Sequence, residues 1–190
     1  MKSQKRSIKF LERKEVERLI DGIKIPKKFP MRSLRDRALI EVLFSTGMRI
    51  HEALALTVDE MMIVILEEGT SEFPIIGKGG WQRVVYFSPR AKEAVRRYLD
   101  RIDDDEEILF AMTSRNAQLM VKRRALEAGI KTKVTPHVFR HSLATDLLTR
   151  GVDIRVIQEF LGHRSIANTM IYAQVANKTL KDTHSKLYSK

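Results

Sequence analysis

Helix start and stop signals recur along most of this chain and are interrupted once, between residues 61 and 87. Ser88-Pro89 and Thr135-Pro136 each place a hydroxyl N-cap before a proline at the first helical position. Three glycines stand where helices are expected to end: Gly129, Gly151 and Gly162. These signals predict helices near residues 115–128, 136–150, 154–161 and 166–175.

More helices are expected in the first part of the chain. Residues 10–23 carry apolar side chains close to helical spacing, and the breaker IPKKFP follows them; the apolar positions are Leu11, Val16, Leu19 and Ile20. A second helix opens with Ser33 and Asp36 at capping-box spacing and ends at Gly47. A short helix over IHEALAL, residues 50–56, is expected next.

The stretch between residues 61 and 87 has a different character. The runs MMIVIL (61–66), EFPIIG (72–77) and QRVVYF (82–87) are short and prone to form β-strands, and turn-forming residues separate them. They predict a small antiparallel sheet. The expected fold class is therefore mainly α with a small antiparallel β-sheet, an α+β fold.

The net charge of the chain limits the class of binding partner that we expect. Thirty-five lysines and arginines against 24 acidic residues give a formal charge of +11, which suits a polyanion such as DNA, although a ribosomal or membrane surface would also fit. The chain has 190 residues, enough for one sizeable core, and no cysteine, so it forms no disulfide or thiolate metal site. No signal-type start or run of 18 apolar residues is present, which favours a cytoplasmic protein that spans no membrane.

The segment TPHVFRHSLATDLL, residues 135–148, gathers basic groups on one side of an expected helix. At about 100° per residue, His137, Arg140 and His141 share one stripe and hence one surface. An apolar face runs beside it, formed by Phe139, Leu143 and Leu147. The two histidines have metal-ligand spacing, but no glutamate lies between them and Arg140 would repel a cation, so a metal site is disfavoured. Either histidine alone could simply pack against a neighbour.

Three other segments carry motifs that, together with this basic cluster, indicate a function. STGMRIHEALAL places Arg49 at a helix junction with Glu52 three residues later, GKGGWQR carries Lys78, and LGHRSIANTMIYAQV places Tyr172 nine residues after His163. With H-x-x-R-H, these motifs resemble, in order and at every position, the catalytic signature of the tyrosine recombinase (phage integrase) family. The resemblance covers nearly the whole chain. It implies the catalytic-domain fold of that family and a site-specific DNA recombinase or integrase.

The implied reaction cleaves and rejoins DNA strands through a 3′-phosphotyrosyl intermediate. Arg49 and Arg140 can each present a forked set of donors to phosphate oxygens, a geometry that lysine lacks. Tyr172 is the nucleophile, and its phenol needs activation because its reference pKa is about 10. The broken phosphodiester's energy stays in the new bond, so no ATP is required, and the cations replace a metal; no cofactor is expected.

The resemblance assigns the remaining roles. His137 is the proton acceptor, His163 donates a hydrogen bond to the phosphate, and Lys78 is the general acid that protonates the departing 5′-hydroxyl. Glu52 supports Arg49 or His137 by orienting it, and His141 lies beside the set and tunes it.

Competing interpretations stay open. Taken singly, Arg49 could be a helix C-cap, Lys78 a turn residue, Glu52 a surface charge and Tyr172 a half-buried aromatic residue. Residues 153–175 also resemble a helix-turn-helix, so a non-catalytic DNA-binding protein is the alternative function. A strand transferase similar to type IB topoisomerases would share the chemistry without pairing two sites.

The domain organisation follows from the same resemblance. We expect a basic flexible N-terminus over residues 1–9 and a catalytic domain over 10–190, without the helical core-binding domain that usually precedes it. DNA binding should then be weaker and more salt-sensitive than in a complete enzyme. The C-terminal tail, 177–190, is expected to pack on a neighbouring subunit, giving a homo-tetramer on double-stranded DNA and a monomer off it.

Overall fold

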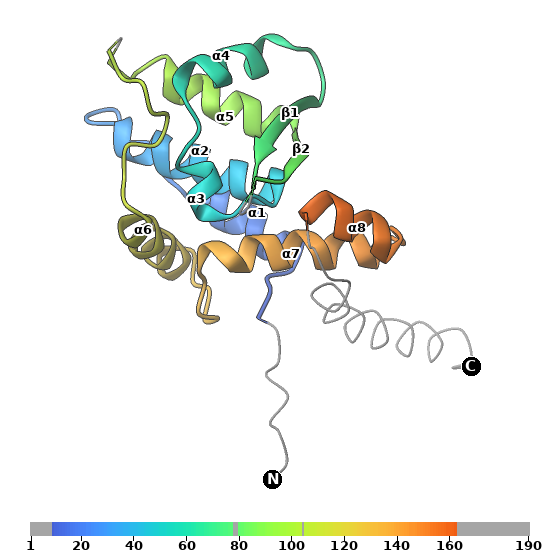
Figure 1. The fold of residues 1–190 in the computed structure, drawn as a ribbon. Coiled ribbons are helices and arrows are strands. Elements are labelled where there is room, and N and C mark those ends of the chain that lie inside the picture. Colours follow the sequence, from blue (N-terminus) through green and yellow to red (C-terminus); the bar gives the residue numbers. More distant parts are fainter. Residues whose placement is uncertain (1–8, 78–79, 104, 163–190) are drawn as a thin grey trace.

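The computed structural model describes residues 9–77, 80–103 and 105–162. In chain order, the elements within these ranges are α1 (Arg13–Asp21), α2 (Met31–Thr46), α3 (Ile50–Ala53), α4 (Val58–Leu66), β1 (Ser71–Ile76), β2 (Gln82–Phe87), α5 (Pro89–Leu99), α6 (Ser114–Glu127), α7 (Pro136–Thr149) and α8 (Ile154–Leu161). Figure 1 shows the helices gathered around α2, with the two strands between α4 and α8. The expected class, mainly helical with a small antiparallel sheet, is confirmed.

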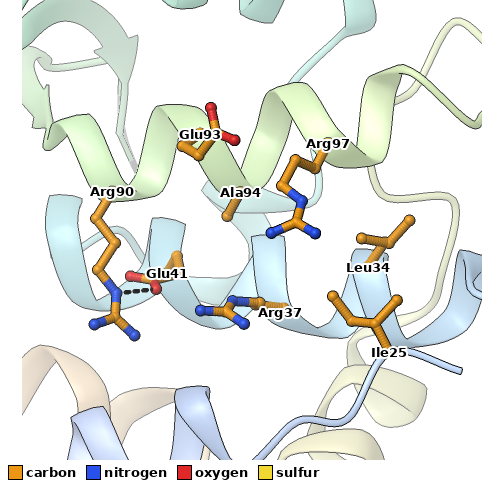
Figure 2. Close-up of a pocket in the computed structure, with 8 residues that line it drawn as sticks. All are labelled: Ile25, Leu34, Arg37, Glu41, Arg90, Glu93, Ala94 and Arg97. Carbon is orange, nitrogen blue, oxygen red and sulfur yellow. Dashed lines mark hydrogen bonds and ion pairs between the residues drawn. The ribbon is translucent and has the colours of Figure 1, made fainter.

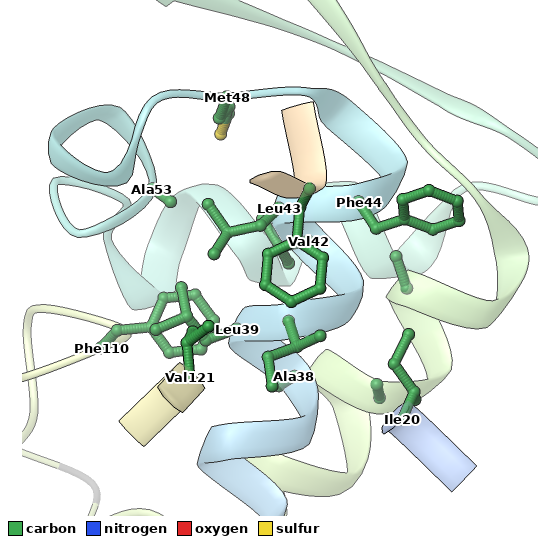
Figure 3. Close-up of a cluster of buried hydrophobic side chains, with 14 of the residues drawn as sticks. Ile20, Ala38, Leu39, Val42, Leu43, Phe44, Met48, Ala53, Phe110 and Val121 are labelled. Carbon is green, nitrogen blue, oxygen red and sulfur yellow. The ribbon is translucent and has the colours of Figure 1, made fainter. Parts of the chain in front are cut away.

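Helix α2 forms the centre of the core. From Ala38 to Phe44 every residue is buried, because apolar residues follow one another around the helix axis rather than along one stripe, whereas Arg32 is exposed and Arg37 partly exposed. Figure 3 shows Ile20 of α1, Val121 of α6 and Phe110 converging on these side chains. The elements that carry the motifs are therefore held against one rigid helix.

Most helix boundaries agree with the local signals. The Ser88 hydroxyl accepts a hydrogen bond from the Ala91 amide at the start of α5, and Pro136 occupies the first turn of α7. Helices α6, α7 and α8 each end within two residues of a glycine at positive φ. The helix expected over 166–175 and both chain ends, 1–8 and 163–190, lie outside the described residues.

The strand expected over MMIVIL is wrong, because this run lies in α4. Thr57 caps the helix: its hydroxyl accepts from the Glu60 amide, and the Glu60 carboxylate accepts from the Thr57 amide. This capping box outweighs the strand preference of the β-branched residues. Only Met61 and Val64, three residues apart, are buried, as expected for a helix with one covered face.

The start of α2 also differs from the prediction. The helix begins at Met31, directly after Pro30, so Ser33 and Asp36 lie inside it and do not form its cap. Asp36 is fully buried, and Arg123 and Arg124 of α6 each donate a hydrogen bond to its Oδ2 at 2.8 and 2.9 Å. These two hydrogen bonds therefore join α2 to α6.

The strands β1 and β2 form an antiparallel hairpin whose base is anchored. Ser71 pairs with Phe87 and Ile76 with Gln82. The Ser45 hydroxyl at the end of α2 donates to the Tyr86 carbonyl at 3.1 Å, and Lys92 of α5 donates to the Ser71 hydroxyl at 2.8 Å. The base is thus tied to α2 and α5, and the Ile76–Gln82 pair lies at the other end of the hairpin.

Helix α8 packs across α7 and the hairpin. Its Ile157 and Leu161 are buried against Ala144 of α7, and its Phe160 stacks on Tyr86 of β2 with ring centroids 5.7 Å apart. Within the described ranges no helix is both long and apolar enough to cross a membrane.

Candidate active site

Three chain segments meet where α2 ends. Gly47 closes the helix in the left-handed conformation, with φ at 62°. A Cβ atom at this position would lie 2.8 Å from Leu161 of α8 and 3.0 Å from Leu143 of α7. Both the backbone conformation and the close approach therefore require glycine here. The residues that follow Gly47 enter the space between α7, α8 and the hairpin.

Arg49 and Glu52 form a local pair in this loop. Arg49 is the N-cap of α3, not a helix C-cap, and its amide and Nη1 donate to the Glu52 carboxylate at 2.7 and 3.0 Å. The reading of Glu52 as a surface charge is wrong, since its side chain is 9% exposed. Arg49 remains one-third exposed. Glu52 therefore fixes one side of an arginine whose other side meets solvent.

Arg83 of β2 completes this cluster. Its Nη1 and Nη2 donate to the two oxygens of Glu52 at 2.9 and 2.6 Å, and its side chain is only 10% exposed. Burial raises the pKa of Glu52, but hydrogen bonds from Arg83 and Arg49 more than offset it and lower the pKa to about 2. The carboxylate is therefore an anion near neutral pH, held by two arginines.

Sequence reasoning missed Arg83, although the strand pattern contained a signal. Alternate residues of a strand point to the same side, so Arg83 shares a side with Val85 and Phe87, both of which are fully buried. An arginine on the inward side of a strand needs a buried carboxylate partner. Glu52 supplies that partner from 31 residues away.

Arg140 of α7 ties two motif segments together. Its guanidinium donates to the backbone carbonyls of Gly47 and Leu161, and its side chain is 4% exposed. The expectation that His137, Arg140 and His141 share one surface is therefore wrong in depth: Arg140 is buried, His141 is half-buried and His137 is exposed. A helical stripe predicts direction, and the packing of α2 and α8 over α7 determines depth.

Burial and nearby arginines lower the pKa values of both histidines. Desolvation is the largest cause that lowers the pKa of His137, followed by repulsion from Arg140 and Arg49. Burial also lowers the pKa of His141, with His137 and Arg140 adding to it. Both imidazoles are thus biased toward the neutral form, in which one ring nitrogen accepts a proton.

The other three predicted residues, Lys78, His163 and Tyr172, lie outside the described residues. Gly77, which precedes Lys78, and Gly162, which precedes His163, are described. A Cβ on Gly77 would lie 3.2 Å from Arg83 Nη1 and 3.5 Å from Glu52 Oε1. A Cβ on Gly162 would lie 2.7 Å from Arg83 Cδ. Both glycines therefore border the same ion pair.

A shallow pocket between α2 and α5 is a separate feature. Figure 2 shows Arg37, Glu41, Arg90 and Arg97 around it, with Ile25 and Leu34 at one end. None of the predicted site residues that the structure describes lines it. In the part of the chain that the structure describes, no three histidine or acidic side chains gather as a metal site. The convergence near Glu52 is the candidate site, and its cations can meet an anion such as a phosphate.

Comparisons with known proteins identify the family of the chain. The model of the phage integrase family matches residues 9–179. The tyrosine recombinase XerD of Corynebacterium glutamicum is 38% identical over 183 residues, covering 88% of this chain and 57% of that protein.

Solved structures of recombinases also match this chain. The XerA recombinase has a TM-score of 0.75 and 29% identity, over 95% of this chain and 65% of that one. The XerH site-specific recombinase, in a post-cleavage complex with palindromic difH substrate, has a TM-score of 0.81 and 26% identity, over 98% of this chain and 56% of that one. The chain spans less than two thirds of each of these relatives. It belongs to the phage integrase family, the tyrosine recombinases.

Proposed function

We propose that the chain is the catalytic part of a site-specific DNA recombinase, which cleaves and rejoins strands through a 3′-phosphotyrosyl intermediate. One observation carries the proposal: Arg49 and Arg140, distant in sequence, converge at the Gly47 loop. The glycines next to Lys78 and His163 border the same cluster. Family membership and the charge of +11 also favour DNA as the substrate.

The cations would meet the charge of the scissile phosphate. The transition state of phosphoryl transfer spreads negative charge over the non-bridging oxygens, and preorganised donors stabilise it. Arg49 is held by Glu52 on one side and exposed on the other, as a donor to an external phosphate requires. Arg140 approaches from α7, with its guanidinium already fixed by backbone carbonyls.

Proton transfers would use the remaining groups. His137 accepts the proton of the Tyr172 phenol, and its lowered pKa keeps it neutral and ready to do so near pH 7. Lys78 protonates the departing 5′-hydroxyl, His163 donates a hydrogen bond to the phosphate, and His141 supports His137. The phosphotyrosyl bond conserves the energy of the broken phosphodiester, so we expect no requirement for ATP, metal or another cofactor.

The remaining length of the relatives leaves room for another domain. We propose that residues 10–190 form the catalytic domain and that a second domain completes the grip on DNA in the longer relatives. The tail, 177–190, would join subunits into a tetramer on double-stranded DNA. An activity on chromosomal or mobile-element DNA also fits a cytoplasmic location.

The test is a covalent adduct. The chain is incubated with nicked duplex DNA, whose nick traps the intermediate because the cleaved short strand is lost. An SDS-resistant protein–DNA species with the native chain, absent with Tyr172→Phe, is the expected result. DNA binding by both proteins with no adduct from either would overturn the proposal and favour the helix-turn-helix alternative.

A further inference from the structure

We propose that Arg83 is a positioning residue for catalysis: it compensates and orients Glu52, so that Arg49 keeps both its place and its positive charge toward the phosphate. The proposal rests on the proposed function, since it takes Arg49 as a phosphate-binding group. Arg83 itself is buried and is not expected to touch the DNA.

Hydrogen bonds from Arg83 orient the Glu52 carboxylate. Glu52 accepts two bonds from Arg83, one on each oxygen, and two from Arg49, one from its amide and one from Nη1. The fork of Arg83 therefore determines the plane of the carboxylate, and this plane sets where Nη1 of Arg49 can bond. A lysine at position 83 would supply charge but could not hold both oxygens.

The charge balance of the cluster also depends on Arg83. Arg49 and Glu52 alone would sum to zero, leaving little positive potential for a phosphate. With Arg83 included, the buried cluster has a net charge of +1, and Arg49 is its most exposed member. Arg83 thus allows one carboxylate to anchor Arg49 without neutralising it.

The surrounding backbone confines the Arg83 side chain. The Arg83 side chain lies against Gly77 at one end and Gly162 at the other, with no room for a Cβ at Gly162. Its Nε is buried and has no hydrogen-bond partner among the described residues. The arginine thus spans the gap between Gly77, which follows β1, and Gly162, which ends α8.

The experiment compares adduct formation on two substrates. One carries an ordinary scissile phosphodiester, and the other carries a methylphosphonate that lacks one charged oxygen and needs less compensation from Arg49. Arg83→Met should slow the first reaction on the order of 10- to 100-fold, and Arg83→Lys should slow it less. On the methylphosphonate most of the deficit should disappear. An equal deficit on both substrates would overturn the proposal.

Arg124→Lys is the matched control. Arg124 is also 10% exposed and also bonds a buried carboxylate, that of Asp36, but it lies on α6 away from the cluster. We expect it to lower stability as Arg83→Lys does, and to leave the rate of the folded protein and the substrate ratio unchanged. If Arg124→Lys changed the substrate ratio as Arg83→Met does, a general loss of stability would explain both.

A second measurement does not depend on turnover. Exchange of the Arg49 guanidinium protons, followed by nitrogen-15 NMR, should become faster in Arg83→Met and stay unchanged in Arg124→Lys. Unchanged exchange in Arg83→Met would overturn the positioning role. If the native chain formed no adduct, the proposed function would fail, and the exchange result would still decide whether Arg83 holds Arg49.

Discussion

Two buried glutamates of this chain, Glu52 in the candidate site and Glu41 in the pocket of Figure 2, bond to arginines yet titrate in opposite directions. The pKa of Glu52 falls to about 2. The pKa of Glu41 rises above its ordinary value, because burial outweighs its bond from Arg90. Burial with an arginine partner therefore does not by itself lower the pKa of a carboxylate.

The number of donors makes the difference. Both oxygens of Glu52 accept bonds, and two arginines supply them. Glu41 receives Arg90 Nε on one oxygen, and Arg90 also bonds Asp21 at 2.7 Å. The nearby Asp21 carboxylate raises the pKa of Glu41 further. A shared arginine compensates each carboxylate less than two dedicated ones do.

Paired substitutions should separate the two regions most strongly. Glu52→Gln leaves the largely buried Arg83 next to Arg49 without a carboxylate, so we expect the free energy of unfolding to fall by about 3 kcal/mol. The rate of adduct formation should fall on the order of 100-fold. Glu41→Gln should change stability by less than about 1 kcal/mol and leave the rate unchanged. Urea unfolding and the adduct gel measure both; similar losses in the two variants would contradict the comparison.

Acid unfolding should sharpen the comparison next. The folded pKa of Glu52 lies below the ordinary value of 4.5, so its contribution to stability is present above pH 4.5 and is lost as pH falls toward 2. For Glu41 the sign is reversed: its contribution is present below 4.5 and is lost as pH rises through the raised pKa. Urea midpoints of the native chain and Glu52→Gln should thus converge between pH 4.5 and 2. A constant gap would refute this.

The smallest effect tests the space around Arg83. Gly162 and Gly151 both have positive φ, at 63° and 84°, but only Gly162 is crowded, by the Arg83 side chain. Alanine at either position should cost about 1 kcal/mol for the backbone conformation. Gly162→Ala should in addition displace Arg83 and slow adduct formation. Thermal unfolding and the adduct rate are the measurements; an equal rate loss in Gly151→Ala would remove the role assigned to this contact.

Local signals predicted most of the helices and strands. The Ser88-Pro89 start and the QRVVYF strand over 82–87 depend on neighbouring residues only, and both are confirmed. The MMIVIL run forms a helix rather than the expected strand, because the capping box of Thr57 and Glu60 outweighs its strand preference. Ser33 and Asp36 do not cap a helix; they bond instead to Arg124 and Arg123 of α6, which are far along the chain and so give no local signal.

The candidate site divides in the same way. Arg49 and Glu52 are three residues apart, so their contact is a property of one helical turn and was predictable. The contact of Glu52 with Arg83 crosses 31 residues, and the depth of Arg140 depends on how α8 covers α7. Local spacing predicts neither contact. The only sequence signal was the inward position of Arg83 in its strand, which indicates a buried partner for Arg83 but says nothing of Arg140.

The grip of Arg140 on two carbonyls links folding to readiness for reaction. Leu161 ends α8, so the helix cannot lift from α7 without releasing a bond to this guanidinium. Separation of α8 from α7 and release of the Arg140 guanidinium would then occur together. Under the proposed function, a molecule in which α8 has separated from α7 would hold Arg140 less firmly for phosphate binding, so partly unfolded molecules would not cleave DNA.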